Sequence, residues 1–131
     1  RRHTRYIGDW SSDVCSSDLN SQHWETVIDS MVEVVHGDRG TARHIGKNIS
    51  FKIAGKTGTA QVFGIKQDER YDAETLEKRL HDHALFIAFA PADKPEIVMA
   101  IVVENGGGGS AVATPIARSI IDQYFGITNN D

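Results

Sequence analysis

The sequence has little cysteine, no long apolar run and no surplus of basic residues. Its single cysteine, Cys15, excludes an internal disulfide framework and a cysteine-rich zinc site. No apolar stretch approaches the roughly 20 residues that cross a bilayer, so any membrane attachment is expected to lie outside this chain. Acidic residues outnumber basic ones, and the net charge of -4 argues against a nucleic-acid partner.

The remaining composition is typical of a globular chain, and the 131 residues suit one domain or part of one. Residues 1–19 do not match the rest, because they repeat Ser-Ser-Asp and lack a sustained apolar period. A signal peptide is excluded, since no continuous apolar stretch follows the basic start. We interpret residues 1–19 as a non-native, disordered segment similar to translated adapter or vector sequence, with a genuine disordered arm as the alternative.

Regular patterns begin at Asn20. Apolar residues then recur at helical spacing and predict an amphipathic helix with an apolar face of Trp24, Val27, Ile28, Met31, Val32 and Val35. Asn20 or Ser21 can cap its start, and Gly37 can end it. Trp24 is expected to be a core residue of this helix.

Three strands are predicted after this helix. Residues 51–62 form a strand with small residues in its middle, and residues 84–90 and 96–103 form a hairpin around a proline-rich turn. The two hairpin runs are almost continuously apolar, so both faces are expected to be covered. In the polar stretch 64–83, Asp72 could cap a short helix that carries Leu76 and Leu80 on one face.

A last helix is predicted to begin between Ser110 and Pro115, with Thr114 as N-cap, and to end at Gly126. The glycines at 106–109 are expected to be a flexible joint before it. Its predicted buried stripe is Val112, Ile116, Ile120, Ile121 and Tyr124. The order of elements indicates an α+β fold, an antiparallel sheet with flanking helices.

Gly55-Lys56-Thr57 is similar to the end of a phosphate-binding loop, but that pattern needs a glycine at position 50, where Ser50 stands. Strand-forming residues precede the triplet and Gly58 follows it, where a helix should begin. Nucleotide binding is therefore a poor interpretation, and no cofactor is expected.

Lys56-Thr57-Gly58-Thr59 fits better as the Lys-Thr-Gly element of serine penicillin-recognising enzymes. Lys56 supplies positive potential, and the hydroxyls of Thr57 and Thr59 can donate to a substrate carboxylate in strong, charge-assisted hydrogen bonds. Gly58 has no side chain to hold an extended peptide away from the strand. Ideal alternation sends Lys56 and Thr57 to opposite faces, although a site on the rim of an edge strand could still collect both.

The wider sequence resembles the elongation-type class B penicillin-binding transpeptidases, the penicillin-binding protein 2 family. The resemblance covers residues 20 to about 125, and residues 20–131 are taken as the C-terminal part of the transpeptidase domain. It rests on residues 51–64 (FKIAGKTGTAQVFG), 79–83 (RLHDH), 88–91 (AFAP), 104–107 (ENGG) and 40–42 (GTA).

This resemblance implies a Gram-negative inner-membrane protein whose periplasmic domain acylates a serine with the D-Ala-D-Ala end of a peptidoglycan stem peptide. It also implies β-lactams as ligands, and an elongation glycosyltransferase and scaffold proteins as partners. Lys56 would act electrostatically in catalysis, and Thr57, Gly58 and Thr59 would bind substrate.

The chain departs from the family in its nucleophile. No serine has lysine three residues later, so the Ser-x-x-Lys element is absent, and Ser-x-Asp occurs only at Ser11 and Ser16, inside residues 1–19. Covalent catalysis needs a nucleophile and a base within hydrogen-bond reach. We therefore expect this chain to be a fragment that is inactive alone.

Other polar residues have simpler interpretations. His81, Asp82 and His83 could suggest a metal site, but the resemblance implies that Asp82 and His83 fix the entry to the following strand, and no metal is expected. Lys66, Arg70 and Arg79 could meet substrate or a partner, but a solvated connection is the favoured interpretation. A serine β-lactamase or D,D-carboxypeptidase and a non-enzymatic β-lactam sensor remain alternatives to the transpeptidase.

Overall fold

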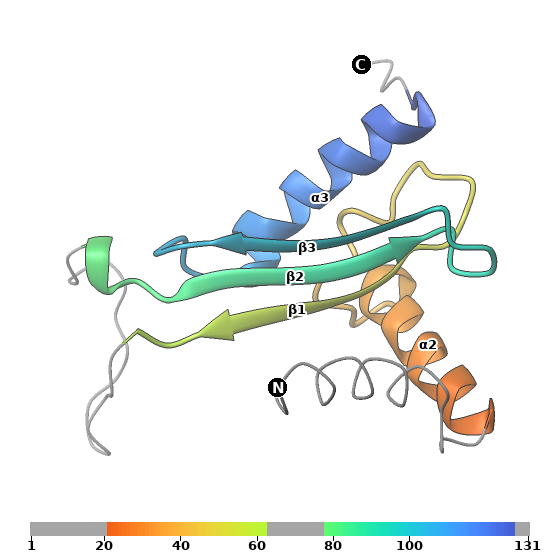
Figure 1. Ribbon diagram of the computed structural model, residues 1–131, viewed down its shortest axis with the longest axis horizontal. Helices are drawn as coiled ribbons and strands as arrows, with labels where there is room; N and C mark the ends of the chain where they lie inside the picture. The colour runs from red at the N-terminus through yellow and green to blue at the C-terminus, as the bar shows by residue number, and fades with distance from the viewer. Residues whose placement is uncertain (1–20, 63–77, 128–131) are drawn as a thin grey trace, which may run out of the picture.

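The computed structural model describes residues 21–62 and 78–127 and contains two long helices and three strands in these ranges. The strands form an antiparallel sheet in the order β1-β2-β3. Helix α3 lies along one face of the sheet, and α2 lies at the end where β1 begins (Figure 1). The predicted α+β class is confirmed.

Helix α2 (Ser21–His36) begins and ends where its capping residues predict. Gly37 closes it, and its N–H donates to the Glu33 carbonyl. Only the C-terminal half enters the core, where Val35 is fully buried. The prediction that Trp24 is a core residue is wrong, because its side chain is 46% exposed and does not belong to the hydrophobic core.

Strand β1 (Ala54–Ala60) is shorter than the predicted 51–62. Phe51 instead packs its ring against Phe125, with centroids 4.6 Å apart, and the Ile53 N–H donates to Nε2 of His36. Inside the strand, a Cβ on Gly55 would lie 2.6 Å from the Phe86 ring, so only glycine fits there without a shift.

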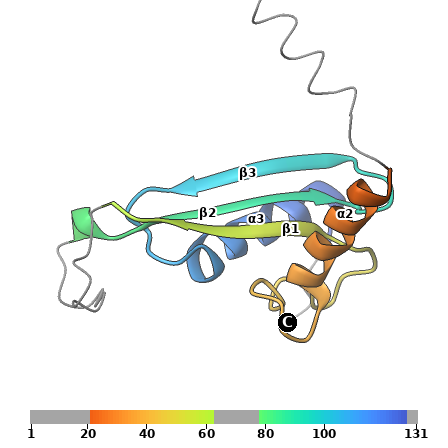
Figure 2. The same ribbon diagram turned by 90° about the horizontal axis from the view of Figure 1, so that it is seen from below.

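Strands β2 (His83–Ala90) and β3 (Ile97–Val103) form the predicted hairpin. Alternate residues of β2 are buried on the face that α3 covers, namely Ala84, Phe86, Ala88 and Ala90. The opposite face of the sheet carries Ile87, Val98 and Val102, and Val98 is 80% exposed. Within the described residues only one face of the sheet is covered, so the cover of the other face stays a prediction (Figure 2).

Helix α3 (Gly109–Phe125) starts earlier than Thr114. Gly108 is the N-cap, and Thr114 is fully buried within the helix, just before Pro115. The predicted N-cap is wrong because glycine lets the helix begin against the sheet: a Cβ on Gly109 would lie 2.2 Å from the Gly58 carbonyl oxygen. The end is as predicted, since Gly126 has a φ of 65° and its N–H donates to the Asp122 carbonyl.

The buried stripe of α3 differs from the prediction. Ile121 is fully buried and Val112 packs against the core, but Ile116, Ile120 and Tyr124 are exposed. The stripe that packs on the sheet contains Ala113, Ala117 and Ile121, whose spacing of four places them on one helix face. Small residues allow the helix axis to approach the sheet closely. The prediction missed this stripe because it was based on the large apolar residues of the helix.

The glycine run at 106–109 was predicted to be a flexible joint, but its first two residues are held by backbone hydrogen bonds. The Gly106 N–H donates to Val103 and the Gly107 N–H to the Asp82 carbonyl, at 3.2 and 2.8 Å. A 3-10 turn, η1 (Lys78–Leu80), precedes β2. The interpretation of residues 1–19, the short helix at Asp72 and the roles of Lys66 and Arg70 lie outside the described residues. No helix among the described residues is long and apolar enough to cross a membrane.

Candidate functional site

The four predicted site residues lie together on β1. The register pairs Lys56 with Ile87 and Thr57 with Phe86, so Lys56 faces the open side of the sheet and Thr57 the side that α3 covers. Thr59 pairs with Ala84 on the Thr57 side, and Gly58 pairs with Leu85 on the Lys56 side. Among the described strands β1 pairs only with β2, which makes it an edge strand.

Lys56 is exposed, and its ammonium donates to the carbonyl oxygen of Thr57 at 2.6 Å. The side chain therefore bends back onto the backbone of its own strand. It lines a cavity of about 300 Å³ between β1, α2 and the following turn, together with Ser30, Glu33, Val34, Gly37, Arg39, Gly40 and Thr41. This cavity holds charges of both signs, with Lys56 and Arg39 on one hand and Glu33 on the other.

Thr57 has a hydroxyl partner that the sequence motif does not include. Its Oγ1 lies 2.9 Å from Oγ1 of Thr41, and either oxygen can be the donor. Thr57 is half-buried. The only sequence signal for Thr41 was its place in the triplet Gly40-Thr41-Ala42, which carries no geometry by itself.

The turn that carries Thr41 is held from two helices. The N–H of the fully buried Ala42 donates to the Val34 carbonyl of α2 at 2.9 Å. On the other side the Ser110 hydroxyl of α3 donates to the carbonyl of Thr41. Nε2 of His44 also lies 2.8 Å from the Thr114 hydroxyl of α3. Thr41 is thus fixed between the two helices and β1.

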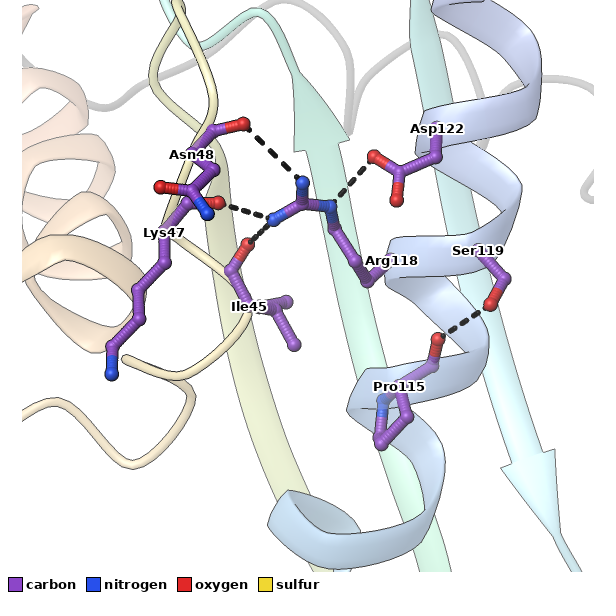
Figure 3. A network of polar contacts seen from close by, with 7 residues as sticks. All are labelled: Ile45, Lys47, Asn48, Pro115, Arg118, Ser119 and Asp122. Atoms are coloured by element: carbon purple, nitrogen blue, oxygen red, sulfur yellow. Dashed lines mark hydrogen bonds and ion pairs between the residues drawn. The ribbon is translucent and has the colours of Figure 1, made fainter. Parts of the chain in front are cut away.

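Arg118 fastens the next part of the same segment to α3 (Figure 3). Its guanidinium donates to the carbonyls of Ile45 and Lys47 at 2.7 and 2.6 Å, and to that of Asn48 at 3.4 Å. Asp122, one turn further along the helix, accepts from Nε at 2.6 Å. The Arg118 guanidinium therefore binds three backbone carbonyls, and the carboxylate of Asp122 in the same helix balances its charge.

Thr59 and Gly58 meet the start of α3. The hydroxyl of Thr59, which is exposed, accepts a long hydrogen bond of 3.4 Å from the Gly109 N–H. Because Gly109 approaches the Gly58 carbonyl so closely, the first turn of α3 fixes this end of β1. Such a bond leaves the Thr59 proton available to a further acceptor.

His36 joins the end of α2 to the residues before β1. Its Nε2 accepts the Ile53 N–H at 2.9 Å, which requires that nitrogen to be unprotonated. Burial lowers the pKa of His36 below 6.5, and the nearby Lys52 cation adds to this, while Glu33 opposes it. The junction is therefore built around a neutral imidazole.

The phosphate loop and the metal site are the two interpretations that the sequence does not favour, and the structure bears on both. Gly55-Lys56-Thr57 lies inside β1, which continues to Ala60 where a phosphate loop would begin its helix. Nδ1 of His83 accepts the Asn105 N–H at 2.9 Å, and the Asp82 carbonyl accepts from Gly107. Both residues thus fix the entry to β2, as predicted. No group of three or more metal-ligating side chains gathers in the described parts of the chain.

This arrangement can bind an anion. An exposed ammonium and two threonine hydroxyls lie along one edge strand, and the unpaired edge of β1 can accept an extended peptide. Such donors suit a terminal carboxylate. These 131 residues hold no serine with lysine three residues later.

A sequence model described as the penicillin-binding protein transpeptidase domain matches residues 15–122. Among curated relatives, the peptidoglycan D,D-transpeptidase MrdA of Haemophilus influenzae is 46% identical over 78% of this chain. MrdA of Escherichia coli K12 is 43% identical over 86% of it. The chain spans only 16% and 18% of the length of these two relatives.

Solved structures show the same similarity. Pseudomonas aeruginosa PBP2, in complex with WCK 5153, matches 86% of this chain and 21% of its own, with 39% identity and a TM-score of 0.66. Helicobacter pylori PBP2, in complex with MreC, matches 84% and 19%, with 31% identity and a TM-score of 0.63. A ceftriaxone acyl-enzyme complex of penicillin-binding protein A from Mycobacterium tuberculosis matches 73% and 19%, with 35% identity and a TM-score of 0.52.

Proposed function

The chain belongs to the penicillin-binding protein transpeptidase domain family, and on that premise we propose that it forms one wall of a peptidoglycan D,D-transpeptidase active site. In this proposal Lys56, Thr57, Gly58 and Thr59 bind the terminal carboxylate of a stem peptide that ends in D-Ala-D-Ala. The observation that carries the proposal is the placement of this Lys-Thr-Gly-Thr run on the edge strand β1.

The residues on β1 have distinct roles in this reaction. Lys56 supplies positive potential, the two threonine hydroxyls donate to the carboxylate oxygens, and Gly58 lets the peptide approach the backbone. A backbone N–H of the same strand is suited to donate to the developing oxyanion. Together these groups hold the scissile bond in place and stabilise negative charge without forming a bond to the substrate themselves.

The nucleophile of the proposed reaction is a serine of the Ser-x-x-Lys type, which these 131 residues do not contain. Its hydroxyl attacks the carbonyl of the penultimate D-Ala, and the terminal D-Ala leaves with the proton on its amine. An amine of a neighbouring strand then attacks the ester, forms the cross-link and releases the serine. A penicillin acylates the same serine in place of the peptide.

The remainder of the domain is proposed to pack on the open face of the sheet. Residues 20–131 would then be the C-terminal part of the transpeptidase domain. The exposed apolar side chains of Ile87, Val98 and Val102 support this, because an apolar face of this kind is costly in water. Residues 1–19 are proposed to be non-native, although the family match begins at residue 15.

The parent protein is proposed to be anchored in the inner membrane of a Gram-negative bacterium, with its catalytic domain in the periplasm. Its partners would be an elongation glycosyltransferase and scaffold proteins. The curated relatives from Haemophilus influenzae and Escherichia coli support the bacterial group. The MreC complex of the Helicobacter pylori relative supports a scaffold partner.

A fluorescent penicillin tests the proposal. The full-length parent protein should be labelled covalently, and the purified 131-residue chain should not, because it lacks the nucleophile. In the full-length protein Lys56→Met should slow labelling about tenfold to a hundredfold, since a charge-assisted contact is lost.

Thr26→Val is the matched control for this substitution. Thr26 is exposed on α2 and its hydroxyl bonds only within that helix, to Gln22, so labelling should stay at the parent rate. Covalent labelling of the isolated chain, or an unchanged rate in Lys56→Met, would contradict the proposal.

A further inference from the structure

We propose that Thr41 is a positioning residue for Thr57: it donates its hydroxyl proton to Thr57 Oγ1, so that the proton of Thr57 points to the substrate carboxylate. This inference rests on the proposed function, which makes Thr57 a carboxylate ligand. It concerns a residue outside the Lys-Thr-Gly motif and sixteen positions away from it in the sequence.

The distance between the two hydroxyls establishes the contact. Thr41 Oγ1 and Thr57 Oγ1 lie 2.9 Å apart, within the normal range for a hydrogen bond. The backbone of Thr41 cannot drift from this position, because Ala42 is buried and bonded to α2 while the Ser110 hydroxyl holds the Thr41 carbonyl. The turn is also tight, since a Cβ on Gly40 would lie 2.4 Å from the Val34 carbonyl oxygen.

Only one of the two hydroxyl protons can lie between the oxygens, which leaves two arrangements. Each hydroxyl has one proton to donate and two lone pairs to accept with. If Thr57 donates to Thr41, Thr57 presents only lone pairs to the site and repels a carboxylate. If Thr41 donates to Thr57, the Thr57 proton is available for the carboxylate in a charge-assisted bond. The bound substrate therefore selects the second arrangement.

Lys56 favours the same arrangement. Lys56 and Thr41 line one cavity, which also contains Arg39 and Glu33, so its two cations outnumber its one carboxylate. Cations favour hydroxyl lone pairs that point toward them. With its lone pairs toward the cavity, Thr41 has its proton toward Thr57. Thr41 thus links the charge of Lys56 on one side of β1 to the hydroxyl of Thr57 on the other, which the alternation of the strand alone would keep apart.

The test uses the full-length parent protein and two acylating agents, benzylpenicillin and its methyl ester. Thr41→Val keeps the shape of the side chain and removes the hydroxyl. It should lower the second-order acylation rate with benzylpenicillin about fivefold to tenfold, the effect of one hydrogen bond. The rate with the ester, which has no carboxylate anion, should change less than about twofold, and Thr41→Ser should restore the benzylpenicillin rate. An equal loss with both agents would indicate a merely structural role and overturn the inference.

Thr57→Val separates this inference from the proposed function. If Thr57→Val leaves the preference for the carboxylate unchanged, the proposed role of Thr57 fails. If Thr57→Val abolishes the preference and Thr41→Val does not reduce it, the role of Thr57 stands and the inference about Thr41 is overturned.

The double variant Thr41→Val/Thr57→Val measures whether the two hydroxyls act together on the acylation rate. Thr41→Val should cost nothing further in a Thr57→Val background, because the two hydroxyls act through one bond. Additive losses would overturn the inference. Thr41→Ala, which removes the same hydroxyl with less bulk, replaces Thr41→Val if the valine variant does not fold.

Discussion

At the scale of single residues, His36 shows how one neutral side chain joins two elements. Its imidazole accepts the Ile53 N–H where β1 is about to begin, and a protonated ring could not accept. Burial first and Lys52 second lower the pKa of His36 in the folded protein. Protonation therefore competes directly with the contact between α2 and the start of the motif strand.

The lowered pKa predicts how stability depends on pH. Because the folded state binds this proton less readily than the unfolded state, the contribution of His36 is full above the ordinary pKa of 6.5 and is lost as pH falls through the lowered value. Melting temperatures of the full-length protein should therefore fall as the pH drops below 6.5. His36→Gln should flatten this part of the profile.

His23→Gln is the matched control, because His23 lies exposed near the start of the same helix. It should leave the pH profile as it is in the parent protein. A profile that is equally steep with and without His36 would show that this imidazole does not titrate between the folded and unfolded states.

At the scale of elements, α3 organises the segment that reaches the site. Arg118 binds the carbonyls of Ile45, Lys47 and Asn48, while the first turns of the helix bind Thr41 and His44 through hydroxyls. The same helix packs its small residues on the sheet. One element thus positions both β1 and the turn beside it.

Replacing Arg118 tests this role. Arg118→Met keeps the apolar stem but leaves three carbonyls without their cation, and we expect a loss of about 1.5–3 kcal/mol in stability. The rate of acylation by benzylpenicillin should also fall, since Thr41 loses part of its support. Chemical denaturation and labelling rates of the full-length protein measure the two effects.

Ser119→Ala is the control for Arg118→Met. Ser119 is the next residue of α3, and its hydroxyl bonds only to the Pro115 carbonyl one turn earlier (Figure 3). Both stability and acylation should remain close to those of the parent protein. Equal effects of the two substitutions would mean that the guanidinium does not anchor the segment.

At the scale of the whole molecule, the described residues bury one face of the sheet and leave the other open. The open face is apolar, and Met31 of α2 reaches it only at one end, where it lines a cavity with Phe89 and Val98. An apolar sheet face in water promotes association. The isolated chain should therefore unfold without a cooperative thermal transition and should aggregate.

Val98→Lys distinguishes a face that is covered in the parent from one that is open. In the full-length protein it should lower the melting temperature, because a buried, unpaired charge is costly. In the isolated chain, where Val98 is 80% exposed, it should raise solubility without changing helix or strand content by circular dichroism. A cooperative transition of the isolated chain, or a full-length protein indifferent to Val98→Lys, would contradict the proposed packing.

The sequence by itself determined the local features. The helix that ends at Gly37, the hairpin around residues 91–95 and the stop at Gly126 follow from period and capping, which act over a few residues. Lys56, Thr57, Gly58 and Thr59 were placed on one strand for the same reason. These signals do not depend on what packs against the element that carries them.

The tertiary structure alone decided which faces are buried and which distant groups meet. Trp24 and Ile116 have helical spacing, but whether they are buried depends on a neighbour outside their own helix. The start of α3 at Gly109 depends on the close approach of this residue to Gly58, which lies far earlier in the sequence. The bond between Thr41 and Thr57 joins a turn to a strand through two side chains. A one-dimensional pattern carries no information on such contacts, because their energy depends on where two separate segments come to lie.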